Sequence, residues 1–583
     1  MYEYGKGVPQ NYPEAMKWYL KAARQGNVFA QNSVGHLYLD CKGVEQDFST
    51  AKEWFFRAAD QGQAAAQCNL GMSYSRDNDH RKAMEWFMKS ADQGDTIARF
   101  CVGAMYYSGT GASQDLTKAM EWYLRAANQG YAIAQFSVGA MYDAGEGVPQ
   151  DYHNAAQWYS KAANQGDAAA QYNLGFLYQF DRGVESDISM AVEWYTKAAD
   201  QGLAQVQHYL GLLYHVGDIV PQDKLKARGW YLRAAEQGDL NAQFNLGTMY
   251  DDGDGATQDY QEAVKWYSRA ASQGHAMAQY SLGLLFQNGR GVPLDSSKAM
   301  EWYTKAADQG NINAHFCLGF MYYHGKGALQ DYTNALECYI KAADESHAAA
   351  QNCVGDMYYD GKGVTQDFVG AREWYLKSVD QGHASAQKNL GNLYYYGLGV
   401  PQDHQKAMEW FVMAADQGCA RAQCKIGAMY QDGYGGPQSL PKAVEWFRKA
   451  ADQGDATAQY SLGVIYQSGN GVPRDYQRAM EWHLKAADQG QVDSLCLIGV
   501  MYQDGQGVPQ DHQNAMKWFR KAIDQGQLSS QSLIGAMNQT TQGDCQRNQN
   551  AAVWFWEAAR LGYATAQYNI GTLYYSGNVV PPD

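Results

Sequence analysis

Residues 167–202 read DAAAQYNLGFLYQFDRGVESDISMAVEWYTKAADQG. Each half of this segment carries an apolar stripe with the spacing of a helix. Ala170 and Leu174 lie one turn apart in the first half, and Trp194 and Ala198 lie one turn apart in the second. This spacing predicts two short amphipathic helices, here called A and B, joined by a glycine-containing turn.

The same pattern returns along the chain with a fixed period. Fifteen of the sixteen tryptophans share one repeat position, and Cys338 replaces tryptophan there once. The step between neighbours is 36 residues, except for the 32 residues from Trp54 to Trp86. A period of this length predicts an all-α solenoid of stacked helix-turn-helix units.

The repeats divide the 583 residues as one continuous array. We predict fifteen complete repeats over 27–562, flanked by half repeats at 1–26 and 563–583. Neither half has the polar surface that a terminal repeat of a solenoid normally needs. We therefore expect either that the sequence is part of a longer one or that a partner covers the ends, for example by end-to-end self-association.

Recurrent small and polar residues mark the helix ends and the core. Asp, Asn or Ser stands seven residues before nearly every tryptophan position, which predicts the start of helix B. A glycine eight residues after that position predicts its end, with Ser346 as the exception. A glycine on helix A and an alanine on helix B never change, so we expect close backbone approach with Trp and Tyr on the flanks. Repeat 311–346, with Cys338 and Ser346, is the predicted weak joint.

Composition excludes several classes of partner. The net charge is −15 and no basic cluster occurs, so we expect no binding to nucleic acid or to an anionic membrane surface. No apolar run approaches the roughly 20 residues of a membrane helix, so we expect no membrane insertion. The first residues lack the apolar region of a signal peptide. We expect a cytoplasmic protein with ten free cysteines, most of them buried.

Motifs for chemistry are weak. Residues 251–255 and Glu262 suggest a calcium loop, but glycines occupy liganding positions and Ala256 stands where the turn glycine belongs. His208 and His215 flank Gly211 without metal-ligand spacing, so we assign them a solvated or groove role. We find no phosphate loop and no Ser/His/Asp or Cys/His set. The sequence therefore predicts no enzyme and no cofactor.

The strings A-x-A-Q-x-x-L-G-x-x-Y, G-x-G-V-x-Q-D and A-x-E-W-Y-x-K-A-A-x-Q-G resemble Sel1-like repeats over essentially the whole chain. The resemblance implies an α/α solenoid coiled into a right-handed superhelix, similar to tetratricopeptide domains, with helix A lining a concave groove. It also implies a scaffold or adaptor that binds proteins or peptides in signalling or complex assembly. Two alternatives stay open: a β-lactamase-like hydrolase, as described for cysteine-rich relatives whose paired cysteines are absent here, and a structural self-associating rod.

The groove of helix A supplies the candidate partner-binding residues. One polar register, two residues before the recurrent glycine, resembles the asparagine that bonds a peptide backbone in tetratricopeptide domains. A second register, one residue after the glycine, is often large and apolar, and further apolar residues and tyrosines follow one turn later. Packing or hydrogen bonding between repeats is the alternative explanation for all of them. The candidates are Asn173, Phe176, Phe180, Leu212, Val216, Asn245, Leu284, Phe320, Tyr323, Tyr359 and Tyr395.

Overall fold

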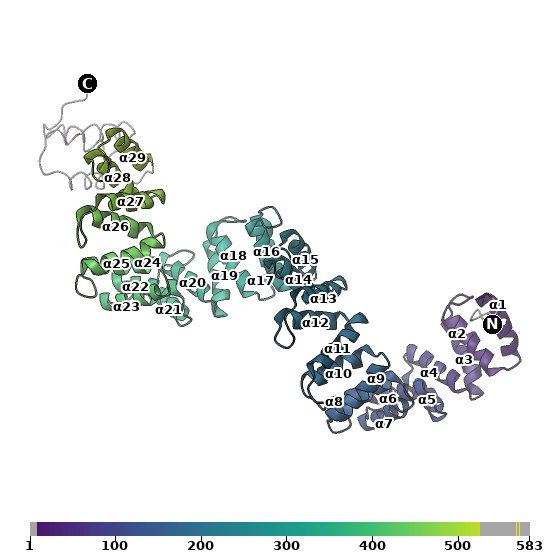
Figure 1. Cartoon of the computed structure of the whole chain (residues 1–583). Helices are drawn as coiled ribbons and strands as arrows, with labels where there is room; N and C mark the ends of the chain where they lie inside the picture. Colours follow the sequence, from purple (N-terminus) through teal and green to yellow (C-terminus); the bar gives the residue numbers. More distant parts are fainter. Residues whose placement is uncertain (1–8, 525–566, 568–570, 572–583) are drawn as a thin grey trace. The chain divides into compact units, whose positions relative to one another are not determined.

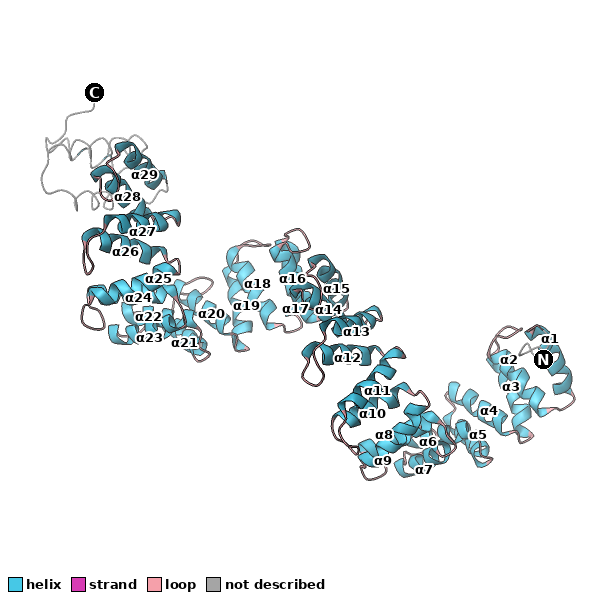
Figure 2. Cartoon of the chain, viewed as in Figure 1, coloured by secondary structure: helices cyan, strands magenta, loops and turns pink. Residues whose placement is uncertain are grey.

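The computed structural model describes residues 9–524, 567 and 571, and these contain 29 helices and no strand (Figures 1 and 2). Contacts between Cα atoms divide the chain into two compact units, Met1–Leu294 and Asp295–Asp583, and each is described by itself. The predicted all-α architecture of tandem helix pairs is confirmed. Residues 1–8 of the first half repeat, the whole repeat at 527–562 and most of the half repeat at 563–583 lie outside the described residues.

The first unit begins with a B helix and continues with alternating A and B helices, so that even-numbered helices are A and odd-numbered helices are B. Its helices are α1 (Tyr12–Arg24), α2 (Val28–Leu39), α3 (Phe48–Asp60), α4 (Ala64–Arg76), α5 (His80–Asp92), α6 (Thr96–Ser108), α7 (Leu116–Ala127), α8 (Ala132–Ala144), α9 (Tyr152–Asn164), α10 (Ala168–Gln179), α11 (Ile188–Asp200), α12 (Ala204–Val216), α13 (Lys224–Glu236), α14 (Leu240–Asp252), α15 (Tyr260–Ser272) and α16 (Ala276–Asn288).

The second unit keeps the same alternation. Its described helices are α17 (Ser296–Ala307), α18 (Ile312–His324), α19 (Tyr332–Asp344), α20 (Ala348–Asp360), α21 (Phe368–Val379), α22 (Ala384–Tyr396), α23 (His404–Asp416), α24 (Ala420–Asp432), α25 (Leu440–Asp452), α26 (Ala456–Ser468), α27 (Tyr476–Asp488), α28 (Val492–Asp504) and α29 (His512–Asp524). Within each unit, helices that are consecutive in the chain pack against one another.

The predicted helix ends are found where the polar and glycine positions recur. Asp187 precedes α11, and its side chain accepts a hydrogen bond from the backbone N–H of Met190. Ser439 precedes α25 but makes no side-chain capping bond. Gly145 follows α8 with φ +74, in the left-handed region that glycine adopts without strain. Local sequence therefore sets the helix boundaries.

The core differs from the prediction in which aromatic residue it buries. The residue after the tryptophan, most often tyrosine or phenylalanine, is fully buried, as Tyr195 and Tyr231 are. Its ring packs on the recurrent glycine of helix A: a Cβ added at Gly211 would lie 2.5 Å from Cδ1 of Tyr231. The glycine therefore makes room for this ring, because any side chain there would overlap it. The backbones also approach closely, as expected, because a Cβ added at Gly175 would lie 3.0 Å from the Ala191 carbonyl oxygen.

The tryptophans mostly lie at the edge of this core. Trp230 is half-buried, and the Arg233 guanidinium lies 4.6 Å from its ring centroid. The same stacking of Lys or Arg from the next turn occurs at most other tryptophans in the described repeats, with Trp194 and Trp266 among the few that are buried. This cation–π contact shields the indole face while leaving its edge accessible.

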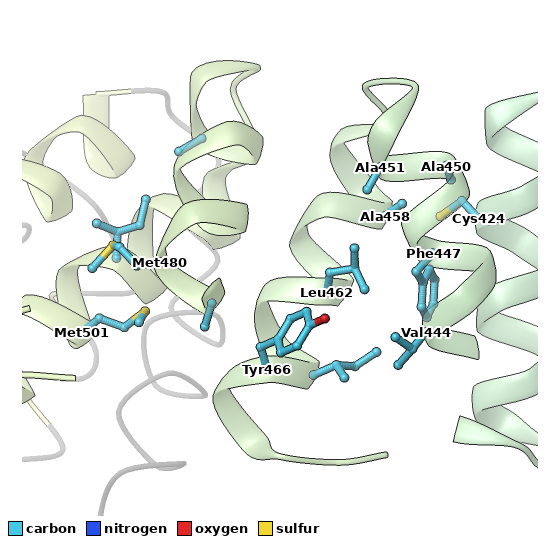
Figure 3. Packing of buried hydrophobic residues seen from close by; sticks show 14 of the residues in the cluster. Cys424, Val444, Phe447, Ala450, Ala451, Ala458, Leu462, Tyr466, Met480 and Met501 are labelled. Carbon is cyan, nitrogen blue, oxygen red and sulfur yellow. The ribbon is translucent and has the colours of Figure 1, made fainter. Parts of the chain in front are cut away.

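The apolar core continues from one helix pair to the next. In the second unit one cluster of buried residues includes Phe447 of α25, Leu462 of α26, Met480 of α27 and Met501 of α28 (Figure 3). Within each unit, each described repeat packs one face against the preceding helix pair and the other face against the following pair. No described repeat therefore has a separate core. This is the packing expected of a solenoid.

Buried glutamines form a second link between repeats that the sequence analysis did not identify. Gln207 of α12 donates from Nε2 to the Ala199 carbonyl of the preceding repeat at 2.8 Å. Its Oε1 accepts from Nε2 of Gln237, at the end of α13, at 2.7 Å. The same pair of bonds is made by Gln135, Gln171 and Gln243, among others. Both ends of the amide are thus satisfied in the interior.

Repeat 311–346 has the unusual features that its sequence indicated. Ser346 adopts φ +63, a left-handed conformation that costs energy for a residue with a Cβ. Cys338 occupies the tryptophan position, so Lys341 has no indole to stack on and instead bonds Glu337 at 2.8 Å. These contacts support the expectation of a weaker repeat, which stays a prediction.

Candidate partner-binding surface

Neighbouring A helices lie side by side within each unit, and their outward positions form what we call the A-helix face. The Tyr209 hydroxyl of α12 donates to Oε1 of Gln179 on α10 at 2.9 Å. In the second unit Nδ2 of Asn389 on α22 donates to Oδ1 of Asn352 on α20 at 3.0 Å. These bonds align the repeat registers of adjacent A helices.

The asparagine register of the candidate site joins repeats to one another. Nδ2 of Asn245 lies 3.1 Å from Nε2 of His208 on the preceding A helix. Asn389 occupies the same register and bonds Asn352 of the preceding repeat at 3.0 Å, and Asn173 lies half-buried on α10. These contacts match the alternative explanation of hydrogen bonds between repeats. That Asn173 and Asn245 bind a peptide backbone stays a prediction.

Four of the apolar candidates form a patch on α10 and α12 in the first unit. The rings of Phe176 and Phe180 are 4.5 Å apart between centroids, and the exposed fraction of Phe180 is 49%. Leu212 and Val216 occupy the same two registers on α12 and are 39% and 50% exposed. We call Phe176, Phe180, Leu212 and Val216 the apolar patch. Large apolar side chains exposed together on a soluble surface commonly mark an interaction site.

Leu284 does not adjoin this patch. It lies half-buried on α16 in the same register, and Thr248 of α14 occupies the register between Leu212 and Leu284. The Thr248 hydroxyl donates to the Phe244 carbonyl at 3.1 Å and accepts from the Tyr267 hydroxyl at 3.2 Å. A polar, locally bonded residue therefore interrupts the apolar register.

The candidates of the second unit contact neighbouring side chains. The half-buried ring of Phe320 packs on His324 with centroids 4.3 Å apart. Nζ of Lys362, from the next repeat's turn, donates to the Tyr323 hydroxyl at 2.6 Å. Tyr359 packs edge-on against Phe368 at 5.3 Å. These contacts hold the side chains in place and agree with packing between and within repeats.

Tyr395 completes this tyrosine series and shows the same behaviour. Its ring lies 5.1 Å from His404 and 6.0 Å from Tyr434, which belongs to the turn of the next repeat. The equivalent register in the first unit pairs Tyr107 with Glu146, whose Oε2 accepts its hydroxyl at 2.6 Å. The register thus serves mainly to dock the turn of the following repeat.

The sequence analysis did not identify the half-buried carboxylate of Asp356 on the A-helix face. Oδ1 of Asp356 accepts from the Tyr375 hydroxyl at 2.7 Å and from Nδ2 of Asn389 at 2.8 Å, and Oδ2 accepts from Nδ2 of Asn352. Burial raises the pKa of Asp356 and lowers the pKa of the neighbouring Lys388. Asp356 is the single carboxylate in the register after the glycine, which is the signal that could have found it.

Metal-binding side chains do not converge among residues 9–524. These residues hold no group of three or more His, Cys, Asp or Glu side chains that could bind a metal ion. Asp254 lies in the turn at 251–255, whose sequence suggested a calcium loop. It pairs with Lys224 at 2.5 Å and with His215 at 3.0 Å. Over the same part of the chain no helix is long and apolar enough to cross a membrane.

The Sel1 repeat model matches almost the entire length. The matched residues are 1–27, 28–63, 64–95, 98–131, 132–167, 168–203, 204–239, 240–275, 276–311, 312–347, 348–383, 384–419, 420–455, 456–491, 492–527 and 564–583. A search of curated proteins gave no match.

Solved structures with the same repeat resemble the chain. A protective antigen of uropathogenic Escherichia coli strains, which displays an SLR fold, is 33% identical with a TM-score of 0.55, and covers 84% of this chain and 97% of its own. A Sel1 repeat protein from Oxalobacter formigenes is 36% identical over 53% of this chain and 89% of its own, with a TM-score of 0.45. The first comparison shows the shared fold.

Proposed function

The chain belongs to the Sel1 repeat family, and on that premise we propose that it is a non-catalytic scaffold that binds a partner protein or peptide on the A-helix face. Its role would be the assembly of a signalling or other multiprotein complex. Helical solenoids of this kind typically act through extended protein-binding surfaces.

The apolar patch is the observation that carries this proposal. Phe180 and Val216 present their side chains to solvent on two neighbouring A helices, although neither is needed to fill the core. Within the described part of the first unit, the hydrogen-bonded Asn245 and Thr248 follow directly beyond them. An apolar surface bordered by polar residues favours a protein partner over a charged ligand.

The partner expected on this surface is a segment with adjacent apolar side chains. The patch extends along two helices, so an amphipathic helix or an extended peptide with two or three apolar anchors would bury it. The polar surroundings would then supply hydrogen bonds at the rim. The charged and amide groups around Asp356 give the A-helix face of the second unit a different, polar chemistry.

The test is a pull-down from an extract of the source cells, with captured proteins identified by mass spectrometry. The bait carries Phe180→Asp and Val216→Asp together. Placing charges at two contact positions should lower the recovery of specific partners by at least about tenfold. Both side chains are exposed, so far-ultraviolet circular dichroism should show unchanged helical content.

A matched control is available on a B helix of the same unit. Leu225 of α13 is also exposed, and Leu225→Asp should leave the captured set unchanged. If the patch variant retains every partner, or if the control variant loses the same partners, the A-helix face is not the binding surface and the proposal is wrong.

A further inference from the structure

A cavity of about 400 Å³ opens between α3 and α4 in the first unit. Its volume falls within the range of pockets that bind small molecules or peptide side chains. We call it the α3–α4 cavity, and the residues that line it are Ser49, Lys52, Glu53, Phe56, Arg57, Leu70 and Tyr74.

In other repeats the turn between helices A and B covers the equivalent place on the preceding repeat. Gly147, in the turn after α8, lies so close to the start of α7 that an added Cβ would be 2.6 Å from the Leu116 carbonyl oxygen. Gly183 and Gly291 approach the first residues of α9 and α15 in the same way. The turn of each such repeat therefore rests on the first turn of the preceding B helix.

A valine in each of these turns fills the space beneath. Val148 packs in one cluster with Met120 and Leu124 of α7 and with Val138 and Tyr142 of α8. Other turn valines pack on the preceding B helix in the same way: Val44, Val184, Val220, Val364, Val400, Val472 and Val508.

The α3–α4 cavity has the same walls but no valine. Lys52, Phe56, Leu70 and Tyr74 occupy the repeat positions of Met120, Leu124, Val138 and Tyr142. The turn after α4 is four residues shorter, with only Asp77 and Asn78 before the capping residue Asp79. The deleted residues are those that carry the glycine and valine. In this repeat Lys52 pairs with Asp77 of the short turn, its Nζ lies 3.8 Å from the Tyr74 ring centroid, and both Lys52 and Tyr74 line the cavity.

The Ser49 hydroxyl is a hydrogen-bond donor at the edge of the cavity. The second residue of helix B bonds the turn glycine in other repeats: Nδ1 of His153 lies 3.1 Å from the Gly183 carbonyl oxygen, and the Ser297 hydroxyl donates to the Gly327 carbonyl at 3.4 Å. Ser49 is the equivalent residue of α3, and no partner for its hydroxyl is found among the described residues.

We propose that the α3–α4 cavity binds a glycine-valine turn presented by a partner polypeptide. The valine side chain packs against Phe56 and Tyr74, and the preceding glycine allows the backbone to approach α3. The Ser49 hydroxyl donates to the carbonyl of that glycine. One complete turn of the chain displays this occupant: the Gly183 carbonyl oxygen lies 3.1 Å from Nδ1 of His153, and Val184 packs in the cluster of α9.

The binding test uses the full chain and a blocked synthetic peptide with the sequence of residues 145–151, Gly-Glu-Gly-Val-Pro-Gln-Asp. Isothermal titration or ligand-observed NMR should show saturable binding. Ser49→Ala removes one hydrogen bond and should weaken binding by about 2- to 10-fold. A peptide with Val148→Asp should bind at least about tenfold more weakly, because burying its carboxylate against Phe56 would cost free energy.

The decisive variant restores the missing turn by replacing Asp77 and Asn78 with the six residues 145–150. Its own valine should then fill the cavity and abolish peptide binding. Phe56→Asp replaces the exposed apolar wall of the cavity with a charge, should also abolish peptide binding, and tests the same point if the restored turn does not fold. Equal binding to the wild type and both variants would assign the peptide to another surface. That result, equal binding of the Val148→Asp peptide, or no binding to the wild type would each overturn the proposal.

Discussion

Substitution by alanine should change the free energy of unfolding differently at two glycines of one repeat. Gly211 lies on α12, where an added Cβ would be 2.5 Å from Cδ1 of the fully buried Tyr231. Gly229 lies on α13 of the same repeat, where an added Cβ meets nothing within 4 Å. Both are helical residues, so Gly→Ala changes the helix propensity by a similar amount at each position.

The difference between the two variants isolates the contact with the aromatic ring. Replacing a helical glycine with alanine stabilises by about 1 kcal/mol where space allows. Gly229→Ala should therefore raise the free energy of unfolding by about 1 kcal/mol. At Gly211 overpacking costs about 1–3 kcal/mol, so the net effect ranges from neutral to about 2 kcal/mol destabilising. The two variants should differ by about 1–3 kcal/mol.

Hydrogen exchange of the α12 and α13 amides measures this difference locally, which is necessary because long repeat arrays do not unfold in a single two-state step. A smaller side chain at position 231 provides an internal control. Tyr231→Leu should reduce the destabilisation caused by Gly211→Ala in a double-mutant cycle. If Gly211→Ala and Gly229→Ala are equally stable, the packing of the tyrosine on the glycine does not limit this position and the reasoning is refuted.

Three further predictions concern single repeats. Burial lowers the pKa of His483 from 6.5 to about 4. As the pH falls, the unfolded chain therefore binds a proton at this histidine before the folded chain does. The free energy of unfolding near α27 should be fully present above pH 6.5 and fall by up to about 3 kcal/mol towards pH 4. Hydrogen exchange against pH should show this loss, and a loss of equal size in His483→Phe would contradict it. Ser346→Gly should stabilise by about 1 kcal/mol in hydrogen exchange of the α19 and α20 amides because φ is +63 there, and unchanged exchange would argue against strain. Gln207→Ala should destabilise by about 0.5–1.5 kcal/mol by removing one of the hydrogen bonds to the Ala199 carbonyl, and unchanged hydrogen exchange of the α11 and α12 amides would exclude this role.

The candidate site was only partly accessible to sequence reasoning. Phe180 and Val216 could be found because they break the polar pattern of their register, and the structure shows both exposed. The hydrogen bonds of Asn245 and Tyr323 could not be predicted from the sequence, because their partners, His208 and Lys362, belong to neighbouring repeats. Such contacts join residues 37 and 39 positions apart and depend on how the repeats stack.

The sequence by itself determined the repeat period, the helix pairs and their ends, because these follow from the spacing of apolar residues and from capping groups within a few positions. Asp187 and Gly145 illustrate this local control. Only the tertiary structure decided that Tyr231 rather than Trp230 fills the interior, since the ring that meets the glycine depends on the rotation of one helix against another. Likewise, the short turn at Asp77 was visible in the sequence, but the space that it leaves on α3 exists only because each turn rests on the repeat before it.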